Sequence, residues 1–234
     1  MSNTMQAKHI SIFILKSICI SLLLAVQTSV MAQKPKLPMQ QQPDTTRLFR
    51  HIAVSVDLVG MAQMQLSDYG QIEVAARLNL KDKYFPVVEL GYGKADSENP
   101  GTLLHYTSKA PYGRIGIDFN TMKNKHDDYR MYAGFRFAYS NFKYSVHHPG
   151  LIDPVWKTRT EYRLNDIGNQ FSWLEAVFGV DAKIWGPFRL GWSVRYRARL
   201  SYKAEEVGYA WYVPGYGRQK SNLLSGTFNV TLEL

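Results

Sequence analysis

The sequence predicts an all-β fold, an eight-stranded antiparallel up-and-down barrel that crosses a membrane. First, apolar and polar residues alternate in eight segments, a two-residue period that is typical of strands. Second, several segments exceed the 5–6 residues usual for a globular strand, whereas a membrane-spanning strand needs about 9–11. Third, the connections alternate between short and long. Short turns at one end and long loops at the other are typical of outer-membrane barrels.

The eight predicted strands are residues 51–60, 71–80, 85–94, 112–120, 131–140, 173–184, 188–202 and 223–234. In residues 188–202, for example, an apolar row from Phe188 to Tyr202 alternates with a row that holds four arginines. No stretch of helical period stands out between the strands. The predicted short periplasmic turns are 81–84, 121–128 and 185–187, and the predicted long extracellular loops are 61–70, 95–111, 143–172 and 203–222. An even number of strands puts both ends of the barrel on the short-turn side.

The first 47 residues are expected to lie outside the barrel. Residues 8–32 have the order of a secretory signal: basic residues, an apolar core at 17–26 and a small residue, Ala32, at the end. The apolar core is too short for a spanning helix, which needs about 20 residues. We therefore expect a cleaved signal peptide at 1–32, a flexible periplasmic leader rich in proline and glutamine at 33–47, and the barrel at 48–234.

The cysteine count and the net charge limit the kinds of chemistry and the kinds of partner that we expect for this chain. The one cysteine, Cys19, lies in the signal, so the mature chain has no disulfide or thiolate chemistry. The net charge is +9, of which Lys8 and Lys16 of the signal contribute two, which leaves +7. This charge favours contact with an acidic surface such as anionic lipopolysaccharide. We expect no nucleic-acid partner, because no basic cluster has interleaved aromatic residues.

The polar rows are predicted to face the lumen and the apolar rows the lipid. The predicted cations of the lumen are Arg77, Arg114, Arg136, Lys183, Arg189, Arg195, Arg197 and Arg199. The predicted anions are Asp57, Glu73, Glu89, Asp118, Glu175, Asp181 and Glu233. Buried charges of both signs must form ion pairs, and an eight-stranded barrel is just wide enough to be filled by side chains. The sequence therefore predicts a polar lumen network, with Glu175 paired to Arg197, and no open pore.

Two of the predicted loops carry aromatic residues beside cations. Trp156 and Tyr162 lie in 143–172, and Tyr209, Trp211, Tyr212 and Tyr216 lie in 203–222. These six side chains either bind a surface glycan, lipopolysaccharide or a protein ligand, or pack on one another as a cap over the barrel.

No catalytic, cofactor-binding or metal-binding constellation emerges from the residue spacing, so we expect neither an enzyme nor a cofactor. His105 and Ser108 lack a carboxylate in an orienting position, and the adjacent His147 and His148 point opposite ways in an extended chain. Two alternatives stay open. One is an outer-membrane enzyme that modifies lipid A. The other is a soluble periplasmic or secreted ligand-binding barrel, which would need an apolar lumen.

The signal ending VMAQ, the eight alternating segments and the closing FNVTLEL resemble the small OmpA/OmpX-like outer-membrane β-barrels. More narrowly, the chain is similar to a family of such barrels named only as a domain of unknown function. The resemblance implies export to the outer membrane of a Gram-negative bacterium, with outer-membrane lipid, lipopolysaccharide and the barrel-assembly machinery as partners. That machinery reads a last strand that usually ends in Phe, whereas this chain ends in Leu234. The role implied is structural or one of surface interaction.

Overall fold

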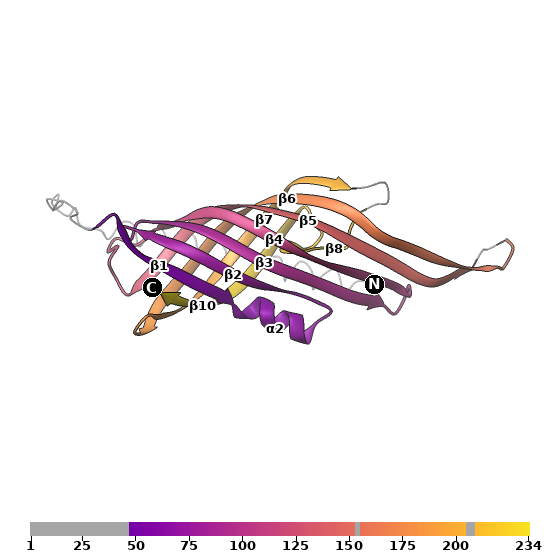
Figure 1. The fold of residues 1–234 in the computed structure, drawn as a ribbon, viewed down its shortest axis with the longest axis horizontal. Helices are drawn as coiled ribbons and strands as arrows, with labels where there is room; N and C mark the ends of the chain where they lie inside the picture. Colours follow the sequence, from indigo (N-terminus) through magenta and orange to yellow (C-terminus); the bar gives the residue numbers. More distant parts are fainter. Residues whose placement is uncertain (1–46, 153–154, 205–208) are drawn as a thin grey trace, which may run out of the picture. The chain divides into compact units, whose positions relative to one another are not determined.

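The computed structural model describes residues 47–152, 155–204 and 209–234. The expected signal peptide and all but the last residue of the expected leader lie outside this part of the chain. Eight long strands form the barrel wall (Figure 1), and they are β1 Phe49–Asp57, β2 Tyr69–Leu80, β3 Tyr84–Asn99, β4 Leu104–Asn120, β5 Tyr129–Ile152, β6 Arg159–Trp185, β7 Phe188–Ala204 and β10 Asn222–Glu233. The helix α2, Leu58–Leu66, and the two short strands β8, Tyr212–Val213, and β9, Gly217–Arg218, complete the described elements.

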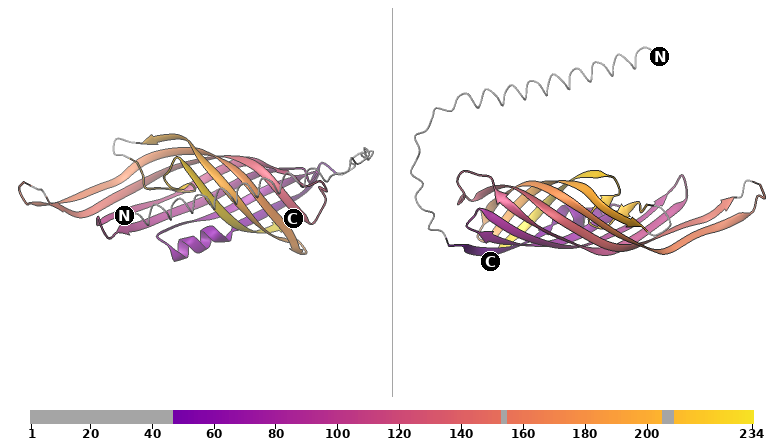
Figure 2. Two further views of the ribbon diagram at one scale, coloured as in Figure 1. Left: turned by 180° about the vertical axis from the view of Figure 1, so that it is seen from behind. Right: turned by 90° about the horizontal axis from the view of Figure 1, so that it is seen from above.

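The barrel is closed and antiparallel throughout. Its strands follow the order β1-β10-β7-β6-β5-β4-β3-β2, so that each long strand pairs with its neighbours in sequence and β1 pairs with β10 to close the ring. Figure 2 shows the barrel from behind and from above. The predicted eight-stranded, up-and-down barrel is therefore confirmed.

The two ends of the barrel differ. At one end, here named the turn end, the connections are residues 81–83, 121–128 and 186–187. The last of these is Gly186-Pro187, where Gly186 takes a φ of +53°, a conformation that glycine adopts without steric cost. The opposite end, here named the loop end, holds the connections that follow β1, β3, β5 and β7.

The loop end contains more strand and less loop than expected. β5 and β6 are 24 and 27 residues long and project as a hairpin beyond their neighbours (Figure 1), and β3 and β4 continue to the turn at 100–103. The predicted loops 95–111 and 143–172 are therefore mostly paired strand. In these segments the inward row holds buried residues such as Tyr106, Tyr144 and Phe171, whereas the outward row is polar, so the apolar outward row on which the strand prediction relied is absent.

The predicted strand 51–60 ends early. Asp57 caps a helix instead, and its carboxylate accepts hydrogen bonds from the N–H groups of Val59 and Gly60 at 3.1 Å each. The expectation that no helix occurs is thus wrong for α2. Its apolar residues surround the helix without forming one stripe, and for this reason the 3.6-residue period is not visible in the sequence.

The outer face of the wall carries an apolar belt. Outward-facing side chains from every wall strand are exposed, among them Ile52, Ile72, Leu90, Ile115, Phe135, Leu174, Trp192 and Leu224. No helix in the described ranges has the length and hydropathy needed to span a membrane.

Candidate functional site

The interior of the barrel toward the turn end is filled by ion pairs. At their centre lies Glu89 of β3, which is 1% exposed. Its carboxylate oxygens lie 2.7 Å from Arg136 Nε, 2.8 Å from Arg195 Nη1 and 3.0 Å from Arg114 Nη1. Three guanidinium groups from β4, β5 and β7 thus converge on one carboxylate. The planar, five-donor guanidinium suits such shared pairing, because it can bond more than one acceptor at once.

Glu73 and Glu175 complete this centre. Glu73 pairs with Arg114 and lies 3.2 Å from Arg195, and it accepts a hydrogen bond from the Tyr112 hydroxyl at 2.8 Å. Glu175 accepts a hydrogen bond from the Trp173 indole at 2.7 Å. The predicted ion pair between Glu175 and Arg197 is found, since the two residues are register partners and their charged atoms lie 3.1 Å apart.

A second tier lies closer to the turn end. Arg136 holds Asp118 through two parallel bonds of 2.7 and 2.9 Å. Arg77 bridges Asp118 at 3.2 Å and Asp181 at 3.4 Å, and Arg189 holds Asp181 at 2.6 Å. The two tiers share Arg136, so the network is continuous from Glu175 to Asp181.

The turn end is closed by a third cluster around Asp82, which follows β2. Asp82 pairs with Arg50, accepts a hydrogen bond from Asn79, and lies 2.7 Å from His126 Nδ1. Burial opposes ionisation of the carboxyl group, but the hydrogen bonds from Asn79, His126 and Arg50 outweigh it and lower the pKa of Asp82. Beside this cluster, Glu233 lies 2.6 Å from Arg130 and 3.0 Å from His51.

Most, though not all, of the predicted lumen residues belong to this network. Arg199 is exposed although its register partner Trp173 is buried, and it lies next to a bulge at Ser172/Trp173 that sets an extra residue of β7 against β6. Lys183 is also exposed, beside a second irregularity at Lys183/Trp185. Asp57 is buried, and its carboxylate caps the helix α2 instead of taking part in the ion-pair network.

The sequence analysis does not single out several members of the network, among them Arg130, Asp82 and Tyr112. Arg130 has the inward parity of Tyr132 and Arg136, and it directly precedes the predicted strand 131–140, so one more residue would include it. Asp82 belongs to a turn, and Tyr112 is the first residue of the predicted strand 112–120. No local signal in the sequence identifies either as a partner of a charge.

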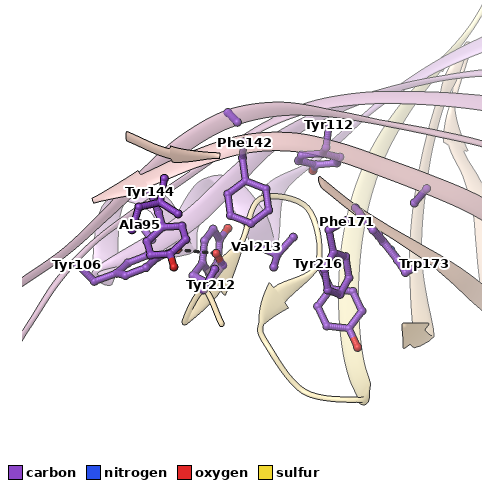
Figure 3. Packing of buried hydrophobic residues seen from close by; sticks show 14 residues of the cluster. Ala95, Tyr106, Tyr112, Phe142, Tyr144, Phe171, Trp173, Tyr212, Val213 and Tyr216 are labelled. Carbon is purple, nitrogen blue, oxygen red and sulfur yellow. Dashed lines mark hydrogen bonds between the residues drawn. The ribbon is translucent and has the colours of Figure 1, made fainter. Parts of the chain in front are cut away.

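The interior toward the loop end is filled differently, by aromatic side chains. The segment 209–218, which contains β8 and β9 and is here named the plug, folds back into the barrel (Figure 3). Tyr212 and Tyr216 are 1% and 0% exposed, and the Tyr216 ring packs 4.8 Å from Phe171 and 5.6 Å from Trp173. These two tyrosines, for which both ligand binding and packing as a cap were open, lie inside the barrel, where their rings fill the space between its walls.

The ion-pair network holds the plug in place. Arg197 donates to the Tyr216 carbonyl oxygen and Arg114 to the Gly215 carbonyl oxygen, both at 2.7 Å. Gly215 has a φ of +82° and lies against the Tyr112 ring, where a Cβ would collide. The charged and aromatic halves of the lumen therefore meet at these two arginines.

Above the plug, at the loop end, lies a cavity of about 630 Å³, here named the aromatic pocket. Its aromatic lining is Tyr106, Tyr144, Tyr162, Tyr209 and Trp211, and Ser97, Glu98, Asn99 and Thr102 contribute polar groups from the β3–β4 hairpin. The Tyr106 and Tyr144 rings stack at 5.5 Å, and Trp211 meets Tyr106 edge-on at 5.6 Å. Three of the six predicted loop aromatics thus line one pocket, while Trp156 lies in the turn after β5 and is exposed.

The histidines do not assemble a catalytic group with Ser108. His105 lies on the outer face of β4, 2.8 Å from Asp96, whereas Ser108 points inward and donates to the Lys143 carbonyl oxygen. His147 pairs with Glu161 at 2.7 Å, and His148 accepts a hydrogen bond from the Gly150 N–H. Over the described ranges, no group of three His, Cys, Asp or Glu side chains is placed to hold a metal ion.

Comparison with known proteins gives a family and a set of similar structures. The model of the family described as Domain of unknown function (DUF6048) matches residues 11–233. No curated protein matches the chain.

Three solved structures are similar to this chain. The N-terminal β-barrel domain of Pseudomonas aeruginosa OprF is 12% identical with a TM-score of 0.34, over 79% of this chain and 97% of that chain. Neisserial surface protein A (NspA) is 12% identical with a TM-score of 0.38, over 80% and 97%. A major outer membrane protein from Thermus thermophilus is 13% identical with a TM-score of 0.41, over 79% and 100%.

Proposed function

The chain belongs to the DUF6048 family, and we propose that it is a non-enzymatic outer-membrane barrel whose closed lumen supports a glycan-binding pocket at the cell surface. The single observation that carries the proposal is the aromatic pocket at the loop end. The other parts of the proposal are the position in the membrane and the closed lumen.

The outer-membrane position is supported by the two faces of the wall. The outward rows are apolar and exposed, and the inward rows are charged and buried, which is the arrangement of a barrel in lipid and the inverse of a soluble ligand carrier. Export by a cleaved signal peptide in a Gram-negative bacterium belongs to the same proposal. The turn end then faces the periplasm and the loop end faces outward.

The closed lumen is supported by the contents of the barrel. Eight strands enclose a space that side chains can fill. Here the ion-pair network occupies the turn-end half and the plug the other half. A barrel filled in this way is a rigid support for the loop end rather than a passage for solutes.

The ligand class is inferred from the lining of the aromatic pocket. Tyr and Trp rings offer flat faces with negative character, which attract the C–H groups of a sugar ring, and the amide, hydroxyl and carboxylate groups of the β3–β4 hairpin can bond its hydroxyls. An apolar floor with a few converging polar groups is typical of a small-ligand site. We therefore propose an oligosaccharide of the cell surface as the ligand.

The test is a calorimetric titration of the detergent-folded barrel with the core oligosaccharide of lipopolysaccharide, freed of its lipid. Tyr162→Ala removes an aromatic wall of the pocket and should weaken binding roughly tenfold, the equivalent of about 1.4 kcal/mol. Trp185→Ala removes an exposed aromatic residue at the turn end and serves as the matched control, with no change expected.

Two results would count against the proposal. Equal affinities of wild type and Tyr162→Ala, or no binding by wild type, would overturn the glycan pocket. A protein that remains in the soluble periplasmic fraction, with the same gel mobility before and after boiling, would overturn the membrane position.

A further inference from the structure

The barrel wall has a seam on the side of α2. β1 leaves the wall at Asp57, which pairs with Asn229, so β10 has no β1 partner from Asn222 to Phe228. On the other side, β2 has no β1 partner from Tyr69 to Glu73. Two strand edges therefore face each other with no strand between them. In lipid, the unpaired backbone groups of such edges must be covered or bonded.

The helix α2 covers this seam and is fixed to β2. A Cβ on Gly70 would collide with the Met64 backbone, and one on Gly60 would come within 2.7 Å of the Gln71 carbonyl oxygen. These glycines let helix and strand touch backbone to backbone. On the β10 side, Asp57 accepts a hydrogen bond from the Phe228 N–H at 3.2 Å. This bond joins the start of the helix to β10 at the end of the seam where β1 leaves the wall. The helix lies along the flank of the barrel in Figure 1.

Between α2 and β10 the seam remains hollow. A cavity of about 590 Å³ is lined by α2, β2, β10, the plug and Arg197 of β7. Its lining includes Leu224, an outward residue that is 67% exposed, and Arg197, an inward residue that is 4% exposed. The cavity thus runs from the outer face of the wall to the lumen.

The two ends of the cavity differ in chemistry. Its cationic end holds the exposed Arg218 and Lys220 and the buried Arg197, which is paired with Glu175, against one carboxylate of the lining, Asp57, which is committed to the helix cap. Arg218 is held over the Tyr69 and Trp211 rings at 5.2 Å each. The outer end is apolar, with Leu66 and Leu224 among its lining.

One further group in the lining is unsatisfied. The buried Oγ of Ser225 has no hydrogen-bond partner in the described part of the chain. A buried polar atom without a partner is costly, and a ligand that bonds it would remove that cost.

We propose that this seam cavity is a lateral binding site for one single-chain amphiphile with an anionic head group. The head lies against Arg218 and Lys220, and the acyl chain passes between α2 and β10 into the bilayer. At about 590 Å³ the cavity has the size of a small-ligand site, which takes a head group and the first part of one acyl chain, and the rest of the chain lies in the bilayer. The inference rests on the proposed membrane position, but not on the glycan pocket.

The test measures binding of palmitate, lysophosphatidate and hexadecanol to the barrel folded in a neutral detergent. Palmitate and lysophosphatidate carry the two anionic heads, so their ratio tells whether a carboxylate or a phosphate amphiphile is the ligand. Hexadecanol has the same chain without the charge, and its binding should be at least tenfold weaker. The double variant Arg218→Gln/Lys220→Gln should lose at least tenfold in affinity for the anionic ligands and nothing for hexadecanol.

Two more variants test the site further: one blocks the cavity, and the other is a control that removes the same charge elsewhere. Ala62→Trp places a large ring on the α2 side of the cavity and should block all three ligands. Lys94→Gln/Lys109→Gln removes the same charge from two exposed lysines of β3 and β4 and should change nothing. Equal binding of hexadecanol and palmitate, or equal losses in both double variants, would overturn the site. A retained shift in gel mobility on boiling in every variant separates such a failure from loss of the barrel itself.

Discussion

The two halves of the lumen are filled by different physical means. Toward the turn end, carboxylates such as Glu89 are each shared by several arginines. Toward the loop end, Tyr216 packs among Phe171 and Trp173 with ring contacts and few polar bonds. The first half depends on every charge keeping its partners, because an uncompensated buried charge is expensive. The second half depends on shape, because a removed ring leaves a void. One barrel therefore contains both an interior stabilised by ion pairs and an interior stabilised by aromatic packing.

The largest effect is expected from Glu89→Gln. The substitution keeps the shape of the side chain but leaves Arg114, Arg136 and Arg195 without their shared negative charge. Loss of one partner of a buried pair costs about 3–5 kcal/mol, and three affected cations place this variant at the upper end. Urea unfolding of the folded barrel, followed by gel mobility, measures the change.

Glu98→Gln is the matched control, because Glu98 is exposed at the loop end of β3. Its free energy of unfolding should stay within about 0.5 kcal/mol of wild type. If Glu89→Gln behaved like this control, the lumen would not depend on its charges, and the contrast between the two halves would disappear.

A slightly smaller effect is expected from Tyr216→Ala in the plug. Removal of a buried aromatic ring costs about 3 kcal/mol through lost burial and the remaining cavity. Tyr216→Phe keeps the ring but loses the hydrogen bond to the Lys220 carbonyl oxygen, so it should cost only about 1 kcal/mol. The same unfolding experiment distinguishes shape from hydrogen bonding. A Phe variant as unstable as the Ala variant would show that the plug, too, depends on polar contacts.

The two halves also differ in how far the sequence predicts them. Alternation in residues 188–202 places Arg195 and Arg197 inward correctly, because side-chain direction in a strand follows from parity alone. Parity fails beyond Arg199, where a bulge that depends on the facing strand sets Tyr202, a member of the predicted outward row, against the buried Phe171. The burial of Tyr216 cannot be predicted from parity, because a segment that connects two strands has no two-residue period. It depends on the fit of the plug against β6 and β7, which are distant in the sequence. The helix α2 was missed because its apolar residues form no single stripe.

An effect smaller than those of Glu89→Gln and Tyr216→Ala is expected from Asp82→Asn, because Asp82 belongs to the ion pairs of the turn end. Asp82→Asn should cost about 2 kcal/mol at neutral pH, the usual range for a hydrogen bond to a charged group. The pKa of Asp82 is lowered in the folded protein by its hydrogen bonds from Asn79, His126 and Arg50, which outweigh its burial. Its stabilising contribution is therefore complete above the ordinary Asp value of about 3.9, and is lost as the pH falls through the lower folded-state value. Unfolding of wild type and variant from pH 7 to pH 2 should give curves that converge at the acid end. Curves that stay parallel would mean that the variant disrupts packing at the turn and not a charged bond, and the turn end would then belong with the aromatic half of the barrel.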